Sequence, residues 1–390
     1  MHVVVLGTGM IGTTVVSEIV TNPNIEKITA VDGLKESVDR CIDISAEPKV
    51  IGRVASLENE SEIYEVIKDA DVAIACLPHS LSMPAVNAAI KAKCNLVDLV
   101  GSKFEEKYKL DEKAKEAGII IVPGCGVAPG ITNFLAAKGI EMLDEAEEAV
   151  MICGGIPRNP VPPLWYQVVF RLESVMGLYT RPALAAENGK LINLPPLSGL
   201  EKMTFPEPVG ECEAVITDAH SAAHTLKGRV NKLYEKTVRY AGHWNKMSVL
   251  SELGFLDEET VEIDGVSLSP KKFTEKILEP KLRGTSNEDI TVVRVEVKGK
   301  SNGKQIAHTW EMVDCYDHDR GITSMAKTTA IPAMLMASWI INGRVTETGV
   351  LPIEEIIIGN RFDPFIRELD DRGITINYVE SLEKDLQIHN

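Results

Sequence analysis

The chain opens with MHVVVLGTGMIGTTVVSEIV (residues 1–20), in which a short apolar run is followed at once by three glycines, Gly7, Gly9 and Gly12. The apolar run is typical of a buried strand, and the residues after Gly9 have helical periodicity. Three glycines so close together indicate that another group approaches the main chain. Gly-x-Gly-x-x-Gly between a strand and a helix is typical of a turn that binds a dinucleotide pyrophosphate at the helix N-terminus. The expected cofactor-binding residues of this turn are Gly7, Gly9, Met10, Ile11 and Gly12.

An acidic residue ends the next predicted strand. Asp32, in TAVDG, follows Gly12 at the spacing of the ribose-binding acid in such folds. Its carboxylate would accept hydrogen bonds from the adenosine ribose and repel a 2′-phosphate, so the sequence predicts NAD rather than NADP. Methyltransferases also hold a ribose on an acid at this place, but their S-adenosylmethionine has no pyrophosphate to bind.

Short β-branched runs alternate with helical patterns up to about residue 124, which predicts a doubly wound parallel sheet of the Rossmann type. The expected strands are 2–7, 27–33, 49–55, 71–78, 94–100 and 119–124. Ligands of such sheets bind beyond the carboxyl ends of the strands. The ends of the fourth and fifth strands therefore add Cys76, Leu77, Pro78, His79 and Val100 to the expected cofactor site. Asp98 lies at the same edge.

The pattern changes after VPGCGVAPGITNFLAAKGIEML (residues 122–143), where longer and more antiparallel strands are expected. These are 149–156, 165–170, 210–217, and the pair 289–299 and 304–316 joined by a hairpin at 300–303. Helices are expected at 220–236, 244–255 and 324–343. We therefore expect a dinucleotide-binding domain at 1–127, an inserted α+β domain at 128–318, and a C-terminal segment, 319–390, that returns to the first domain.

Composition excludes some partners and locations. The chain has 41 basic and 57 acidic side chains and a net charge of -16, which repels nucleic acid and anionic lipid. The first strand begins next to Met1, with no pattern of a secretion signal before it. The seven cysteines are scattered and form no Cys-x-x-Cys pair. A protein of the cytoplasm with reduced thiols is expected.

Several motifs resemble those of the saccharopine dehydrogenase-like family, and within it the L-lysine 6-dehydrogenase branch. They are GTGMIG (residues 7–12), VDLVG (97–101), VPGCGVAPGITNFLA (122–136), VRYAGHWNKMSVLSELGF (238–255) and GITSMAKTTAIPA (321–333). The resemblance implies a Rossmann domain with an inserted domain that carries the substrate site and forms a homodimer. It also implies that Cys125 and Gly126 lie beside the nicotinamide and that Arg239, Tyr240 and His243 face it. Many relatives have an acidic residue before the cysteine, where this chain has Gly124.

The implied reaction is oxidation of the lysine ε-amine to the 6-semialdehyde, which cyclises to piperideine-6-carboxylate. It requires an anchor for the substrate carboxylate and a proton acceptor. Arg239 is the expected anchor, because a guanidinium matches a carboxylate with two hydrogen bonds, although an ion pair on a surface helix is the alternative. His243 is the first candidate for acid–base chemistry or else a helix cap, and Asp98 is the second. Tyr240 would position the substrate or pack between domains, and Thr217 and Cys125 would contact the substrate.

Two other functions stay open. A saccharopine-type reductase would need a second basic anchor, for which the candidates are Arg158, Arg171 and Arg181. A silent NAD-binding sensor would bind the cofactor without turnover. No metal is expected, because HSAAH (residues 220–224) lacks the glutamate of a zinc motif and DCYDHDRG (314–321) lacks the spacing of a calcium loop.

Overall fold

The computed structural model describes residues 1–168, 172–284 and 286–382, and the chain folds into two compact units. Unit 1 comprises Met1–Lys138 and Ala326–Ile374, and unit 2 comprises Gly139–Met325 and the residues from Thr375 on. The chain thus passes between the units inside two helices, α7 (Ile131–Glu141) and α12 (Ser324–Ile341), rather than at the expected residues 127/128 and 318/319, and it passes a third time between Ile374 and Thr375.

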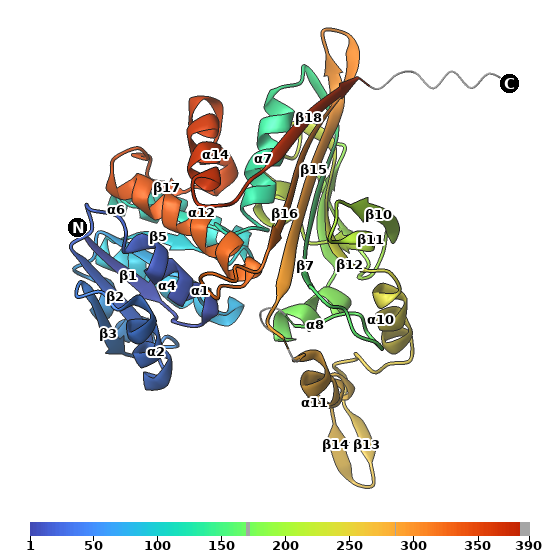
Figure 1. The fold of residues 1–390 in the computed structure, drawn as a ribbon, viewed down its shortest axis with the longest axis horizontal. Helices are drawn as coiled ribbons and strands as arrows, with labels where there is room; N and C mark the ends of the chain where they lie inside the picture. The colour runs from blue at the N-terminus through green and yellow to red at the C-terminus, as the bar shows by residue number, and fades with distance from the viewer. Residues whose placement is uncertain (169–171, 285, 383–390) are drawn as a thin grey trace, which may run out of the picture. The chain divides into compact units, whose positions relative to one another are not determined.

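Unit 1 contains a seven-stranded parallel sheet in the order β17-β6-β5-β4-β1-β2-β3 (Figure 1). Its strands are β1 (His2–Leu6), β2 (Lys27–Asp32), β3 (Val50–Val54), β4 (Val72–Ala75), β5 (Asn95–Asp98), β6 (Ile120–Pro123) and β17 (Gly349–Val350). The order changes direction between β1 and β4, which is the place where open α/β sheets bind their ligands. The doubly wound parallel sheet predicted from the sequence is confirmed, including its third strand.

Helices connect the strands of unit 1, and some of them present small and branched apolar side chains to this sheet. They are α1 (Met10–Ile19), α2 (Lys35–Ser45), α3 (Glu60–Ile67), η1 (His79–Leu81), α4 (Ser82–Ala92), α5 (Phe104–Tyr108) and α6 (Asp111–Ala117). Individual residues determine where two of these helices begin or end. The Asn59 side chain accepts a hydrogen bond from Ser61 N at the start of α3. Gly118, in the left-handed conformation, ends α6.

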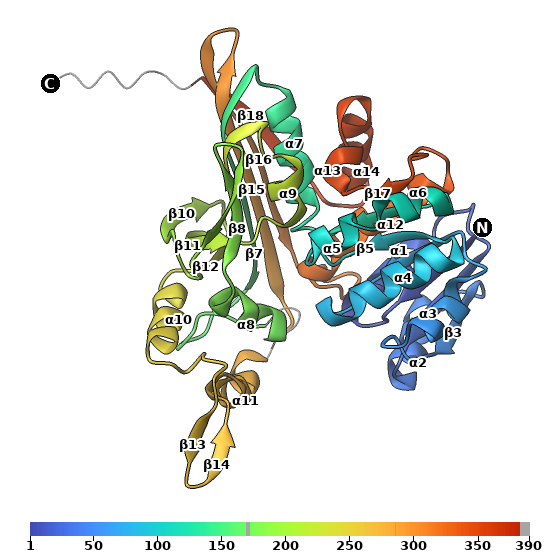
Figure 2. The ribbon, with the colours of Figure 1, turned by 180° about the vertical axis from the view of Figure 1, so that it is seen from behind.

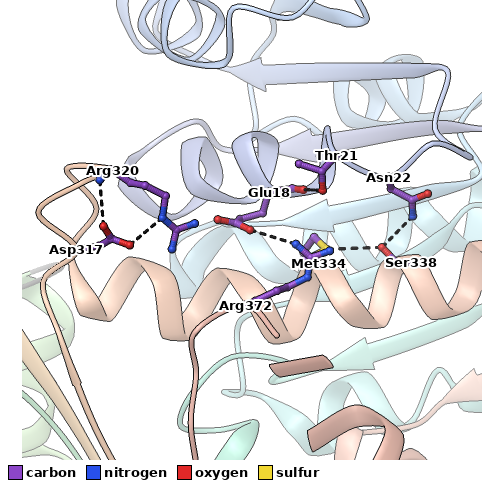
Figure 3. A network of polar contacts seen from close by, with 8 residues as sticks. All are labelled: Glu18, Thr21, Asn22, Asp317, Arg320, Met334, Ser338 and Arg372. Carbon is purple, nitrogen blue, oxygen red and sulfur yellow. Dashed lines mark hydrogen bonds and ion pairs between the residues drawn. The ribbon is translucent and has the colours of Figure 1, made fainter. Parts of the chain in front are cut away.

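The C-terminal part of unit 1 packs against its N-terminal helix. After α12 it forms α13 (Ile353–Ile356), η2 (Gly359–Arg361) and α14 (Phe362–Asp370). Asn22 Nδ2 donates to Ser338 Oγ at 3.3 Å, and Arg372 lies 3.3 Å from the Glu18 carboxylate. Figure 3 shows both pairs. In addition, β17 pairs in parallel with β6. Residues 326–374 therefore complete the first unit, which confirms the prediction that the chain returns to the first domain.

Unit 2 contains a sheet of nine strands in which β10-β11-β12-β7-β15-β16-β18 are neighbours in that order, while β8 pairs with β12 and β9 pairs with β8. The strands are β7 (Glu145–Pro157), β8 (Ala183–Glu187), β9 (Lys190–Leu194), β10 (Glu201–Phe205), β11 (Gly210–Thr217), β12 (Val230–Tyr240), β15 (Asp289–Ser301), β16 (Lys304–Cys315) and β18 (Asn377–Leu382). The final strand pairs with β16, and for this reason residues 375–382 belong to unit 2 rather than to the returning segment.

Two local expectations for unit 2 were wrong. Residues 226–236 were expected to continue a helix, but α9 (His220–Thr225) is short and β12 begins at Val230. The run VNKLYEKTVRY alternates in burial because it pairs with β7 and β11. The strand expected at 165–170 is absent over Trp165–Val168, and residues 169 and 170 lie outside the described residues.

Some helices of unit 2 pack beside β11 and β12 (Figure 2). They include α8 (Leu172–Thr180) and α10 (His243–Glu252), which form an aromatic core with Tyr166, Tyr179 and Trp244. A two-stranded hairpin, β13 (Val261–Ile263) and β14 (Val266–Leu268), and α11 (Pro270–Leu282) follow in the chain.

Candidate functional site

The glycine turn of unit 1 leaves the start of α1 open to a ligand. Gly7 has a φ of +90°, and a Cβ on it would lie 2.5 Å from Cys76 O. A Cβ on Gly12 would lie 1.8 Å from Gly7 O, so this glycine permits the close packing of helix on turn. At Gly9, the N-cap of α1, no described atom lies within 4 Å of a Cβ position, and no described side chain caps the helix. This space at the N-terminus of the helix fits a pyrophosphate.

Asp32, at the end of β2, is fixed by the backbone around it. Its Oδ2 accepts from Thr8 N at 2.8 Å, and its Oδ1 accepts from Leu34 N at 3.0 Å. Thr8 lies between Gly7 and Gly9, so these bonds hold the carboxylate against the glycine turn. The side chain is half-buried. This is the arrangement in which an acid accepts hydrogen bonds from a ribose.

The ends of β4 and β5 place the remaining predicted cofactor residues of unit 1. Cys76 N donates to Leu6 O at 2.8 Å, which holds the segment Cys76–His79 next to the glycine turn. His79 Nδ1 lies 2.8 Å from Ser102 Oγ, after β5. Met10 is exposed and Ile11 half-buried at the start of α1. The two loops thus border the switch point between β1 and β4.

Asp98 was the second candidate for the base, but its carboxylate already has an ion-pair partner and hydrogen-bond donors within the protein. The side chain is 0% exposed, and Lys107 Nζ lies 2.9 Å from its Oδ2. Ser82 Oγ donates to Oδ2 at 2.6 Å, and Val100 N donates to Oδ1 at 2.9 Å. Such a paired and hydrogen-bonded carboxylate fixes the loop after β5 rather than taking a proton from a substrate.

Cys125 and Gly126 lie in a compact loop before α7. Cys125 N donates to Asp98 O at 3.1 Å, and Gly126 N donates to Pro129 O at 2.9 Å. Burial raises the pKa of the Cys125 thiol, so this thiol is protonated at neutral pH. The loop therefore offers backbone groups and a neutral thiol to a ligand, not a nucleophile.

In unit 2, Arg239 is a buried cation on β12. It is 2% exposed, and its guanidinium lies 4.3 Å from the centre of the Tyr166 ring and 5.6 Å from that of Trp244. One NH group donates to Val238 O at 2.7 Å. Within the part of the chain that the structure describes, Arg239 forms no ion pair, although the buried Glu213 lies opposite it in the register of β11 and β12, and its Nε has no hydrogen-bond partner. A buried cation of this kind requires an anion.

His243, the expected acid–base group, lies in an environment that keeps it neutral. It is 0% exposed, its Nδ1 lies 2.8 Å from Leu164 O, and its Nε2 lies 2.9 Å from Tyr179 Oη. Burial and then the nearby Arg239 lower the pKa of His243 to about 3. Because the carbonyl must accept, Nδ1 carries the proton and Nε2 accepts from Tyr179. The imidazole thus orients Tyr179 in the layer around Arg239 and does not titrate near neutral pH.

Tyr240 lies on the opposite face of β12 from Arg239, since neighbouring residues of a strand alternate. Its hydroxyl donates to Pro157 O at 3.1 Å, and its ring packs against a separate cluster that includes Phe205 and Val238. Burial raises the pKa of Tyr240 to about 12. Tyr240 therefore does not lie beside Arg239 and His243, although the three residues are neighbours in the sequence motif.

Thr217 ends β11 on the same face as Arg239, where its Oγ1 lies 3.0 Å from Thr237 Oγ1. The sequence reasoning missed Tyr166, Tyr179 and Glu235, which lie on this face or over it. Glu235 had a signal, because the alternation of VNKLYEKTVRY places residues 235, 237 and 239 on one face of a strand. Tyr166 and Tyr179 had none, since only the tertiary fold brings them to Arg239.

No helix among the described residues is long and apolar enough to span a bilayer. The same residues contain no group of three or more His, Cys, Asp or Glu side chains arranged to hold a metal ion.

Two family models match the chain. The saccharopine dehydrogenase NADP binding domain matches residues 3–122, and the saccharopine dehydrogenase C-terminal domain matches residues 126–374. The second match alone covers more than half of the chain, and the break between the two lies just before Gly126.

Curated relatives are distant. The mitochondrial alpha-aminoadipic semialdehyde synthase of Rattus norvegicus is 22% identical over 98% of this chain and 48% of its own length. The carboxyaminopropylagmatine dehydrogenase of Synechocystis is 23% identical over 95% of this chain and 96% of its own. The chain thus spans about half the length of the mitochondrial relatives it matches. The apo saccharopine dehydrogenase (L-Glu forming) of Saccharomyces cerevisiae superposes with a TM-score of 0.78 at 18% identity, covering 97% of this chain and 99% of that one, which shows a shared fold.

Proposed function

The chain belongs to the saccharopine dehydrogenase family, and from this premise we propose that it is an NAD-dependent amino-acid dehydrogenase that oxidises the ε-amine of L-lysine. The observation that carries the proposal is Arg239, a buried guanidinium that forms no ion pair among the described residues and whose Nε has no hydrogen-bond partner there. An amino-acid carboxylate is the simplest anion that would satisfy it, because it accepts two parallel hydrogen bonds from a guanidinium.

The residues around Arg239 would bind the substrate rather than react with it. The Tyr166 ring packs on one side of the guanidinium, and the Val238 carbonyl fixes one of its NH groups. His243 remains neutral and holds Tyr179, so the substrate carboxylate meets a site whose donors are already oriented. Preorganised donors of this kind lower the entropic cost of binding.

The proposed reaction removes a hydride from the ε-carbon and a proton from the amine, and water then opens the imine to the semialdehyde. NAD, when bound, supplies the hydride acceptor. In unit 1, the open N-terminus of α1 would bind the pyrophosphate, and Gly7 and Gly12 would allow the close approach of the turn. Cys125, being protonated, would contact ligands without forming a covalent bond to them.

We propose NAD rather than NADP because of Asp32. The matching family domain is described as NADP-binding, but Thr8 N and Leu34 N hold a carboxylate at the place where a ribose hydroxyl would lie. A 2′-phosphate there would meet a fixed negative charge.

A saccharopine-type reaction is the second candidate and would require a further basic anchor. Arg158 and Arg181 are both exposed, and Arg158 lies near Tyr240, on the face of β12 away from Arg239. Arg171 lies outside the described residues. The positions of Arg158 and Arg181 favour the smaller substrate. A silent NAD-binding sensor is the third candidate, and it predicts binding without turnover.

The test is formation of reduced nicotinamide with L-lysine, L-ornithine, saccharopine and a diamine, each with NAD and with NADP. Turnover of L-lysine with NAD is the expected result. Arg239→Met should lower kcat/KM for L-lysine about a hundredfold or more, because a charged hydrogen bond to the carboxylate is lost. The dissociation constant for NAD should not change. Turnover of saccharopine alone would favour the second candidate, and NAD binding with no turnover would favour the sensor.

A further inference from the structure

A second buried charged residue lies on the same strand as Arg239. Glu235 is 5% exposed, and its Oε2 has no hydrogen-bond partner among the residues that the structure describes. Burial, followed by the nearby Asp218 carboxylate, raises the pKa of Glu235 well above its usual value. A glutamate that is both buried and unpartnered is costly to the fold, so a retained one suggests a ligand.

The surroundings of Glu235 supply the partners that an ammonium group requires. Thr217 lies opposite Glu235 in the register of β11 and β12, and its hydroxyl contacts that of Thr237 at 3.0 Å. The Asp218 carboxylate is 44% exposed, so the cluster is open on that side. His220 Nδ1 lies 3.6 Å from Asp218 Oδ2. Two carboxyl groups and two hydroxyls are hydrogen-bond acceptors for a primary ammonium.

Glu235 and Arg239 are separate groups on one face of the sheet. Four residues of a strand span about 13 Å between Cα atoms, and both side chains project from the same face. The charged neighbour that raises the pKa of Glu235 is Asp218. Cys153, on the neighbouring β7, pairs with Thr237, which lies between Glu235 and Arg239 on β12. The two charged groups therefore suit opposite ends of one extended ligand.

We propose that Glu235, assisted by Asp218 and the hydroxyls of Thr217 and Thr237, binds the side-chain ammonium of the substrate while Arg239 binds its carboxylate. This inference rests on the proposed function and narrows it to amino acids with a primary amine at the far end. Saccharopine carries a carboxyl-bearing substituent on that amine, and a buried carboxylate would reject it.

Binding at this subsite has a consequence for protons. In the empty subsite burial favours the neutral form of Glu235, whereas a bound ammonium group favours the carboxylate. When the ammonium binds, the Glu235 O–H bond breaks and its proton passes to solvent. The substrate keeps all three of its N–H bonds at this stage. Binding of L-lysine should therefore release a proton, and binding of an amino acid without the side-chain amine should not.

The experiment measures binding of L-lysine and of L-norleucine to the cofactor-free protein by calorimetry in two buffers of different ionisation enthalpy. Norleucine has the same chain without the ammonium. The wild type should prefer lysine and release a proton with it. Glu235→Gln should weaken lysine binding about tenfold or more, leave norleucine binding within about twofold, and abolish the proton release. Glu187→Gln is the matched control, because Glu187 lies on β8 and pairs with Tyr234 on the other face of β12.

The results of this experiment distinguish the proposed ammonium subsite from the proposed oxidation of L-lysine. Equal preference for lysine in the wild type and in Glu235→Gln would overturn the subsite even if lysine is the substrate. A Glu235-dependent preference for lysine without turnover would support the subsite and contradict the proposed reaction. If Glu235→Gln does not fold, Asp218→Asn tests the same point, because this half-exposed position tolerates the change and should still reduce the preference for lysine.

Discussion

The candidate sites of the two units are built from different parts of the polypeptide. In unit 1 the site is made of main chain: glycines that permit close approach, an uncapped helix start, and an aspartate fixed by backbone N–H groups. In unit 2 it is made of side chains, with Arg239, Glu235 and Thr217 on two neighbouring strands and aromatic rings packed over the arginine. A backbone site depends on one short segment, whereas a side-chain site depends on the pairing of distant segments.

This difference also changes how each site tolerates substitution. The glycine turn has no room for a Cβ at Gly7 or Gly12 but does at Gly9. Around Arg239, burial keeps polar groups such as His243 neutral. The electrostatic potential at Arg239 therefore depends on whether these groups are protonated. Four predictions test the contrast.

Gly12→Ala should have the largest effect. The new Cβ would stand 1.8 Å from Gly7 O, and both atoms belong to main chain that has little room to move. We expect unit 1 to be destabilised by about 3 kcal/mol or more and to lose dinucleotide binding. Gly9→Ala is the control, because its Cβ meets no described atom within 4 Å, and it should fold normally. Calorimetric unfolding and NAD titration measure both, and equal stability of the two variants would contradict the packing argument.

His243 should make the stability of unit 2 dependent on pH. Its pKa falls from 6.5 to about 3 in the folded state, so the neutral form is the one that the fold favours. The stabilisation is fully present above pH 6.5 and is lost as the pH falls toward 3, with a total on the order of 5 kcal/mol. In urea unfolding at a series of pH values, His243→Gln should have a flatter profile over this window. A kcat profile with a limb near neutral pH that disappears in His243→Gln would instead restore the acid–base role.

Asp32→Asn should change cofactor choice by a smaller amount. The amide keeps the shape of the side chain and one acceptor but removes the charge that would repel a 2′-phosphate. We expect the ratio of NADP to NAD affinity to rise about tenfold, with L-lysine affinity unchanged. Fluorescence titration with both reduced cofactors measures the ratio. A wild type that already prefers NADP would contradict the proposed use of NAD.

Tyr240→Phe should have the smallest effect. It removes one hydrogen bond, from the half-buried hydroxyl to Pro157 O, on the face of β12 away from Arg239. A loss of about 1 kcal/mol in stability is expected, with kcat and KM within about twofold of the wild type. Steady-state kinetics and thermal unfolding check this. A large loss of kcat with unchanged stability would place Tyr240 in the reaction.

The same contrast explains what the sequence could predict. Gly7, Gly9, Gly12 and Asp32 are informative because their chemistry is local, and the alternating strands placed them correctly in a parallel sheet. The sequence also indicated Arg239 and Thr217 as candidate substrate-binding residues. It predicted a helix over residues 226–236, however, whereas β12 pairs with β7 and β11 from Val230 on. The neutral state of His243 and the ion pair of Asp98 with Lys107 follow from burial, which no local pattern contains. The position of Glu235 on the same face as Arg239 could be recognised only once β12 was known to be a strand.

The discontinuity of both units has a consequence for how the protein is made. Strand β17 and helix α12 complete unit 1, yet they follow the main part of unit 2 in the chain. During synthesis, the edge of β6 and the surface of α1 remain uncovered until the ribosome has produced residues 326–374. A nascent chain would therefore expose an unpaired strand edge for the time needed to translate some two hundred residues, and prolonged exposure of this kind favours aggregation. Slower translation after residue 138 should therefore reduce the yield of folded protein more than slower translation after residue 374.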